Sequence, residues 1–161
     1  MDRRRFQCST GDIMASFEAL FVKSKGKPIV YGEKTLVMSD RLPAHPGARF
    51  RLVFESANAE WRQGVFLRVS GSGNIVVNGE RLTHAVCWRD NAPAIVDFEA
   101  SEGVNSIIVC NVWDCGDGVV HSRHNGAAMI VEELTNSRRY HCNDGVADED
   151  FDDIVFRIER H

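Results

Sequence analysis

The C-terminal part of the chain contains a dense group of carboxylates that could bind a hard metal ion. Residues 144–153 include six acidic side chains and no Lys or Arg, and Asp148, Asp150 and Asp152 occupy alternate positions. Alternate side chains of an extended or looping backbone can converge on one point, and Ca²⁺ requires several oxygen ligands. We therefore predict a calcium site whose candidate ligands are Asn143, Asp144, Asp148, Asp150, Asp152 and Asp153.

The acidic segment also allows a simpler interpretation, in which it is a solvated turn that aids solubility. It is not an EF-hand, although the spacing D-x-D-x-D is present. Asp153 stands where the loop glycine of an EF-hand belongs, and the apolar run that starts at Ile154 replaces the rest of that loop. The sequence leaves the calcium site and the solvated turn open.

The same segment carries a resemblance to a known class of module. The run Asp148-Glu-Asp-Phe-Asp-Asp-Ile-Val-Phe-Arg-Ile resembles the terminal D-x-D-[FY]-[ND]-D-hydrophobic motif of certain bacterial β-sandwich modules. Those modules occur in surface and secreted proteins, where calcium and carbohydrate binding are often proposed. The resemblance implies that Asp148, Asp150, Asp152 and Asp153 occupy the acidic positions of that motif.

A second group of polar residues lies in the glycine-rich segment 113–126. Zinc could use Cys115, His121 and His124, with His141 or Cys142 as a further ligand, but the spacing matches no established zinc motif. The segment could equally be an ordinary polar loop or the rim of a ligand site. The candidate rim residues are Trp113, Asp114, Asp117, Arg123, His124 and Asn125. If the two segments meet in space, Asp114 or Asp117 could join the acidic group around one ion.

These residues favour a noncatalytic binding module for carbohydrate or another surface ligand, with calcium ordering the acidic loop. Aromatic rings pack against the apolar faces of sugars, and the chain offers Trp61, Trp88 and Trp113. Trp88 and Trp113 could instead fill the core. Trp61 lies in a polar run, so we expect it to be the most exposed of the three.

Two other function classes remain open. One is a metal-dependent jelly-roll enzyme that uses His121 and His124. The other is a cytoplasmic interaction protein, such as an inhibitor or immunity-type protein, whose acidic patch faces a basic partner. The sequence contains no G-x-S-x-G elbow, P-loop or H-E-x-x-H motif, so no catalytic residue is assigned and a noncatalytic role is favoured.

Composition narrows the class of protein. The 161 residues, 43% hydrophobic and 26% charged, are typical of one folded domain. Without the six acidic charges of residues 144–153 the net charge of −4 would become +2, and the basic residues are scattered, so nucleic-acid binding is not expected. No apolar run approaches the roughly 20 residues of a membrane span. No signal-peptide pattern is visible, which favours a cytoplasmic location, with secretion by another route left open.

The five cysteines include no C-x-x-C pair. This pattern favours free thiols in a reducing compartment. A bridge between Cys110 and Cys115 is the alternative, if the intervening turn brings the sulfurs together.

The elements that must position these groups are predominantly strands. Residues 49–55 alternate between apolar and polar, and Asn78-Gly79 is a strong signal for a type I′ hairpin turn. Turn residues recur about every ten positions, which predicts an all-β, two-sheet antiparallel sandwich of the jelly-roll kind. We expect a flexible extension over residues 1–13, one domain over residues 14–161, and at most one short helix within residues 11–22. Further strands are predicted at residues 64–70, 94–99, 105–112, 127–134, 138–142 and 153–159.

Overall fold

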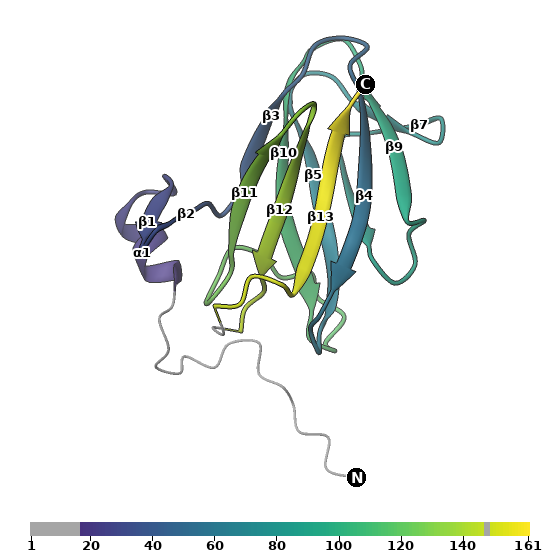
Figure 1. The fold of residues 1–161 in the computed structure, drawn as a ribbon. Helices are drawn as coiled ribbons and strands as arrows, with labels where there is room; N and C mark the ends of the chain where they lie inside the picture. Colours follow the sequence, from purple (N-terminus) through teal and green to yellow (C-terminus); the bar gives the residue numbers. More distant parts are fainter. Residues whose placement is uncertain (1–16, 147–148) are drawn as a thin grey trace.

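A computed structural model describes residues 17–146 and 149–161, and within these ranges it contains one short helix and thirteen strands (Figure 1). The predicted extension at residues 1–13 lies outside the described residues. The helix is α1 (Phe17–Lys23). The strands are β1 (Ile29–Tyr31), β2 (Lys34–Leu36), β3 (Asp40–Pro43), β4 (Arg49–Ala57), β5 (Arg62–Gly71), β6 (Ile75–Val77), β7 (Glu80–Leu82), β8 (His84–Trp88), β9 (Ile95–Ala100), β10 (Val104–Asp114), β11 (Ala128–Leu134), β12 (Ser137–Asn143) and β13 (Ile154–Arg160).

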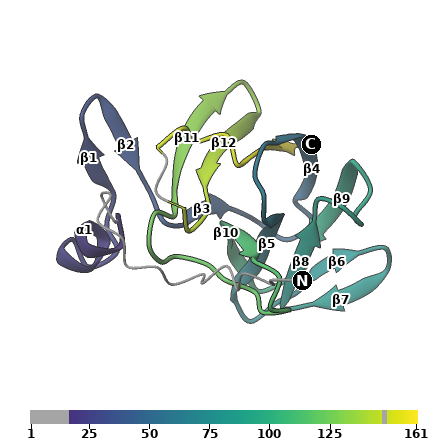
Figure 2. The same ribbon diagram turned by 90° about the horizontal axis from the view of Figure 1, so that it is seen from below.

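Two antiparallel sheets form the body of the domain. The smaller sheet has the strand order β3-β10-β5-β8, and the larger has the order β11-β12-β13-β4-β9-β6-β7. Figure 2 views the two layers from one end. The predicted all-β, two-sheet antiparallel sandwich is confirmed.

Strand β13 shows how the sequence pattern builds the core. Ile154, Phe156 and Ile158 are fully buried, as their alternation predicts, and the Phe156 ring stacks on Tyr140 of β12 with 4.8 Å between ring centroids. The next strand in the sheet, β4, buries Phe50 and Leu52 in the same core, and its register against β13 shifts between Val155 and Phe156. Period-two burial of this kind leaves the other face of the sheet to polar side chains.

The hairpin predicted at Asn78-Gly79 is confirmed. Both residues have positive φ angles, 49° and 81°, and they connect β6 to β7 with Ile75 opposite Leu82. These angles match the two left-handed central positions of a type I′ turn.

The first described elements form a small layer beside β11. Phe17-Glu-Ala-Leu-Phe-Val, within the range in which a short helix is expected, lies in α1. Phe17 and Phe21 are buried in a second apolar cluster with Leu36, Ala128 and Phe151. An isolated bridge between Val37 and Met129 holds this layer against the edge of the larger sheet. In Figures 1 and 2, α1, β1 and β2 lie to one side of β11.

One end of the sandwich gathers the segments of chemical interest. Strands β4, β10 and β12 end there and β13 begins there, at the lower end of Figure 1. The connection between β12 and β13 contains the acidic residues, and the connection between β10 and β11 contains the histidines. Among the described residues, no helix has both the length and the apolar character needed to cross a membrane.

Candidate metal centre and the loops around it

The acidic loop, defined here as residues 149–153, divides its side chains between two directions. Glu149 and Phe151 contact the α1–β1–β2 layer, whereas Asp150, Asp152 and Asp153 gather together. Glu149 and Phe151 have positive φ angles of 59° and 53°, a conformation that is uncommon for residues other than glycine. The tertiary contacts of the two residues hold this backbone in place.

Glu149 and Phe151 anchor the loop. The Tyr31 hydroxyl donates a hydrogen bond of 2.7 Å to Glu149 Oε1. Phe151 is 4% exposed, its ring lies 6.0 Å from that of Phe17, and Lys34 Nζ lies 5.1 Å from its centroid. A buried aromatic ring fixes the backbone on either side of it, so the neighbouring carboxylates have restricted freedom.

The three remaining carboxylates lie close enough to share one cation. One oxygen from each of Asp150, Asp152 and Asp153 lies within 4.8 Å of the others. Calcium–oxygen bonds are about 2.4 Å long, so two oxygens on one calcium ion lie at most about 4.8 Å apart. The three side chains therefore fit a single hard cation, and their proximity carries an electrostatic cost that such a cation would remove.

One oxygen of Asp152 is buried without a hydrogen bond. Its Oδ2 accepts a hydrogen bond of 2.9 Å from Asn58 Nδ2, while its buried Oδ1 has no hydrogen-bond partner among the described residues. A buried polar atom without a partner costs about 1–3 kcal/mol, and such atoms in folded proteins often bind ordered water or an ion. A cation among the three carboxylates would satisfy this oxygen.

Asn143 and Asp144, predicted as ligands, instead brace the loop from within. Asn143 Oδ1 accepts the backbone N–H of Phe151 at 2.7 Å. The Asp144 carboxylate accepts hydrogen bonds from Gln63 Nε2 at 2.8 Å and from the backbone N–H of Val146 at 2.9 Å. Asp144 does not belong to the group of three carboxylates that the described residues form. Asp148, another predicted ligand, lies outside the described residues.

Burial shifts the pKa of the Asp144 carboxyl group. Desolvation raises the pKa of its carboxyl above the ordinary value, and the nearby Asp150 charge acts in the same direction. Hydrogen bonds from Val146 and Gln63 oppose the rise without cancelling it. The backbone N–H of Asp144 also donates to Asp153 Oδ2 at 2.9 Å, which connects this buried residue to the cluster.

Trp113 separates the acidic side of this end from the histidine side. Its ring is fully buried, stacks on His121 with 6.3 Å between centroids, and lies 5.2 Å from His124. On the acidic side, a Cβ built on Gly145 would lie 3.1 Å from the Trp113 ring and 3.3 Å from Trp61. Gly145 and the two histidines thus all pack against one indole.

The histidine loop forms its own cluster. Cys115, Asp117 and His121 each place one ligand atom within 4.8 Å of the others. His121 Nε2 lies 3.0 Å from Asp117 Oδ2, and its Nδ1 lies 3.3 Å from His124 Nε2. Within residues 17–146 and 149–161, Asp117 groups with these residues and not with the acidic loop. Asp114 Oδ1 accepts the backbone N–H groups of Gly116 and Gly118, so it supports its own turn.

His141 and Cys142, the predicted further zinc ligands, lie away from this cluster. His141 Nε2 contacts Glu132 at 3.0 Å in an ion pair between β12 and β11. Cys142 is fully buried in the sandwich core. His141 and Cys142 were predicted as ligands from their residue types alone. Their positions within β12 separate them from the histidine loop.

Most residues of the predicted ligand rim serve the fold. Trp113 is fully buried and presents no ring face to a ligand, so the alternative in which it fills the core holds. The Asn125 backbone N–H donates to Glu18 Oε2 at 2.9 Å, and its carbonyl accepts the N–H of Glu18, which ties this loop to α1. Burial raises the pKa of the Cys110 thiol, and the nearby Arg123 guanidinium opposes this rise. Trp113 therefore fills the core, and the ligand rim in this segment stays a prediction.

Trp88 and Trp61 are both half-buried. The Arg62 guanidinium covers the Trp88 ring at 4.4 Å from its centroid and pairs with Asp90 at 2.9 Å. Trp61 lies beside Gly145, next to the acidic loop. Of the three tryptophans, Trp61 is therefore the one that is half-buried and lies beside the residue that follows Asp144.

The cysteines differ from one another in state. Cys87, Cys110 and Cys142 are free thiols, whereas Cys115 is disulfide-bonded. The prediction of free thiols is confirmed for the first three and wrong for Cys115, and the alternative Cys110–Cys115 bridge is wrong. Burial raises the pKa of all three free thiols, which makes them poor nucleophiles and metal ligands.

Sequence reasoning missed three residues that complete the acidic site. Asn58, Gln63 and Tyr31 come from distant positions and hydrogen-bond to Asp152, Asp144 and Glu149 respectively. None of them has a motif in the sequence. The strand ends and the α1–β1–β2 layer bring them to the acidic loop.

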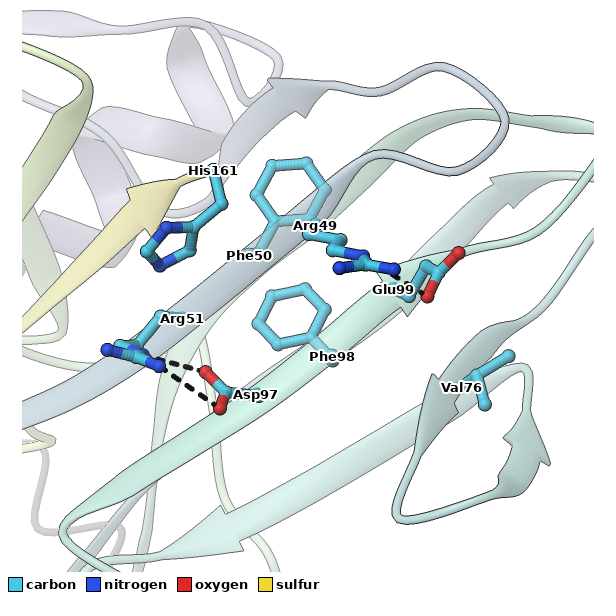
Figure 3. A pocket seen from close by; sticks show the side chains of 8 residues that line it. All are labelled: Arg49, Phe50, Arg51, Val76, Asp97, Phe98, Glu99 and His161. Atoms are coloured by element: carbon cyan, nitrogen blue, oxygen red, sulfur yellow. Dashed lines mark hydrogen bonds and ion pairs between the residues drawn. The ribbon is translucent and has the colours of Figure 1, made fainter.

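A shallow pocket of about 470 Å³ lies elsewhere, on the polar side of β4 and β9 (Figure 3). Arg51 pairs with Asp97 at 2.8 Å and Arg49 with Glu99 at 3.7 Å across its lining, and His161 lies beside them. No residue of the predicted site lines this pocket. Its charges are already neutralised by one another, so it offers a ligand little unpaired charge.

Comparison with known proteins gives no assignment. No protein-family model matches the chain, and no curated protein matches it. Function is therefore inferred from the geometry of the described residues.

Proposed function

We propose that this chain is a noncatalytic β-sandwich binding module whose acidic loop holds a calcium ion. The observation that carries the proposal is the convergence of Asp150, Asp152 and Asp153, with the buried Asp152 Oδ1 lacking a partner. Oxygen ligands without nitrogen or sulfur favour Ca²⁺ over transition metals. Backbone carbonyls and water would complete the six to eight ligands that calcium takes.

The ion would act by fixing the loop. Without a cation, three neighbouring carboxylates repel one another at the point where β13 begins. With a cation, the same carboxylates hold the loop against Asn58 of the β4–β5 connection. A calcium ion in this position would therefore order both connections at one end of the sandwich.

We propose carbohydrate as the ligand of the ordered loops. The support is Trp61, which is half-buried and lies against Gly145, the residue after Asp144, whose backbone N–H donates to Asp153 of the acidic loop. An indole face packs on the C–H face of a sugar ring, and neighbouring carboxylate, amide or calcium groups can bind its hydroxyls. This location differs from the predicted rim, because Trp113 is buried.

Thermal unfolding of the chelator-treated protein, with and without Ca²⁺, Mg²⁺ or Zn²⁺, tests the proposal. A ligand that binds only the folded state at 100 times its Kd stabilises that state by about 2.7 kcal/mol, which raises Tm by several degrees. We expect a calcium-selective rise that Asp150→Ala abolishes. Asp97→Asn is the matched control, because Asp97 is an exposed carboxylate paired with Arg51 on the larger sheet. No rise with calcium, or an equal rise in Asp150→Ala, would contradict the calcium site.

The ligand is tested separately on the calcium-loaded protein. Binding to a panel of immobilised glycans should depend on calcium and should be lost in Trp61→Ala. Trp88→Ala serves as the control, since the Arg62 guanidinium covers that ring. Calcium binding without any glycan binding would keep the ion and reject the carbohydrate.

A further inference from the structure

The connection between β10 and β11 holds a second set of metal-binding groups with different chemistry from the acidic loop. Cys115, Asp117 and His121 offer sulfur, oxygen and nitrogen, and their ligand atoms lie within 4.8 Å of one another. A mixed set of this kind suits zinc and other borderline metals, not calcium. Neither the acidic loop nor Trp61 takes part in it.

The backbone of this connection positions the set. Trp113 and His121 exchange two backbone hydrogen bonds, 3.1 and 2.9 Å long, which close residues 114–120 into a tight loop. Inside it, Asp114 Oδ1 accepts the N–H groups of Gly116 and Gly118. Both glycines have positive φ angles, 101° and 75°, which other residues rarely adopt. Asp117 and His121 are therefore brought together by the fold before any metal binds.

The side chains of Asp117 and His121 are oriented by their neighbours. His121 Nε2 lies 3.0 Å from Asp117 Oδ2, and His124 Nε2 lies 3.3 Å from His121 Nδ1. A metal at Nε2 would replace the proton shared with Asp117, and Nδ1–H would then donate to His124. Metal-bound histidines commonly donate their other ring N–H in this way.

Cys115 controls whether the set is complete. Its sulfur is disulfide-bonded, and a disulfide sulfur is not the thiolate that zinc binds. We propose that reduction of this disulfide creates a zinc site in which Cys115 Sγ, an Asp117 carboxylate oxygen and His121 Nε2 bind the ion and a fourth position stays open. Three protein ligands with one open position are the arrangement of zinc sites that bind water or a substrate.

The redox step balances with an external thiol as the reductant. Two thiols deliver two electrons and two protons to the disulfide and become a disulfide themselves, which leaves Cys115 and its former partner as thiols. Zinc binding then displaces the Cys115 proton to solvent. The other described thiols do not compete, because Cys110 and Cys142 are buried and burial raises the pKa of Cys87.

Cobalt(II) titration of the whole chain, before and after treatment with a phosphine, tests the site. The phosphine replaces the thiol because it supplies the same two electrons, takes the oxygen of one water molecule to become its oxide, and leaves no added thiol to bind cobalt. We expect the reduced protein to bind one equivalent of Co²⁺ with a thiolate-to-cobalt charge-transfer band, and Zn²⁺ to displace it. The oxidised protein should show no such band. Cys115→Ser should abolish the band, and His121→Ala should weaken binding at least about tenfold, since loss of a supporting group alone costs that much.

Two control variants keep the result specific. Cys87→Ser should retain the band, because Cys87 lies outside the cluster. Asp150→Ala should also retain it while losing the calcium response, so that the two sites can succeed or fail independently. Asp117→Ala provides a second ligand variant, and circular dichroism reports whether each variant folds. A reduced protein that binds no cobalt, or one whose band survives in Cys115→Ser, would overturn the proposal.

Discussion

Carboxylates occur in two contrasting settings in this domain. On the outer face of the larger sheet, Glu55 receives hydrogen bonds from Arg139 and Arg157, and these guanidinium groups lower its pKa. At the end of the same sheet, Asp150 and Asp152 face Asp153 across less than 4.8 Å. The first setting pairs its carboxylate with arginines, whereas the second brings three carboxylates of one loop together.

This difference shows where the fold stores unfavourable electrostatics. The paired carboxylates of β4 and β9 stabilise the structure a little and leave no charge for a ligand. The acidic loop keeps its repulsive geometry because apolar and backbone contacts hold it, chiefly through Phe151 and Asn143. We therefore expect an added cation to have a larger effect at the three converging carboxylates than on the outer face, where the carboxylates are paired with arginines.

The largest expected effect comes from removing the apolar anchor. Phe151→Ala should lower the free energy of unfolding by about 3 kcal/mol, because a buried ring is lost from the second apolar cluster. It should also weaken the calcium-induced rise in Tm. Urea unfolding measures the first and calcium titration the second. A loss of less than about 1 kcal/mol would show that Phe151 does not hold the loop.

The free energy of unfolding should depend on pH with opposite signs for Glu55 on the outer face and for Asp144 beside the acidic loop. The pKa of Asp144 is raised in the folded state, so its ionised form destabilises the fold. As pH falls from the raised pKa toward the ordinary pKa, Asp144 therefore adds to the free energy of unfolding. The pKa of Glu55 is lowered, so its contribution is lost as pH falls below the ordinary value. One group can contribute a slope of at most about 1.4 kcal/mol per pH unit.

Asp144→Asn isolates the first of these contributions. The variant also disturbs the hydrogen bond from Gln63 Nε2, but this cost is the same at every pH, so the pH-dependent part of the difference reports the carboxyl group. Urea unfolding of the calcium-free protein over a pH series should then show a wild-type-minus-variant difference that grows in favour of the wild type as pH falls. A difference that does not change with pH would contradict the raised pKa.

A smaller effect is expected from neutralising one carboxylate of the cluster. Asp152→Asn, without calcium, should raise the free energy of unfolding by about 1 kcal/mol, since an amide N–H replaces the unpartnered Oδ1 and the repulsion falls. With calcium the same variant should be less stable than wild type, because a ligand is lost. Destabilisation under both conditions would show that the carboxylates do not repel one another appreciably.

The smallest effect is expected on the outer face. Glu55→Gln should cost less than about 1 kcal/mol, with little change on adding calcium, because partly exposed ion pairs contribute little. Thermal unfolding at low and high salt measures it, and the cost should shrink as salt rises. A larger loss than that of Phe151→Ala would reverse the comparison between the two settings.

The sequence by itself determined the strands and the main turn. Alternation in residues 49–55 and 153–159 predicted β4 and β13, and Asn78-Gly79 predicted the β6–β7 hairpin. These features are local, since the period of a strand and the φ angles of a turn depend on neighbouring residues. The acidic group at Asp150, Asp152 and Asp153 was visible for the same reason, because its members are adjacent in the chain.

Only the tertiary structure decided which groups serve the fold and which stay available. Asn143 and Asp144 are buried braces, Trp113 is a core residue, and Asn58 supports Asp152 from 94 positions away. The register of β12 places His141 and Cys142 away from the histidine loop, while the Trp113–His121 bridge brings His121 to Asp117. Burial and contacts between distant residues depend on how the sheets pack, and no local pattern in the chain encodes them.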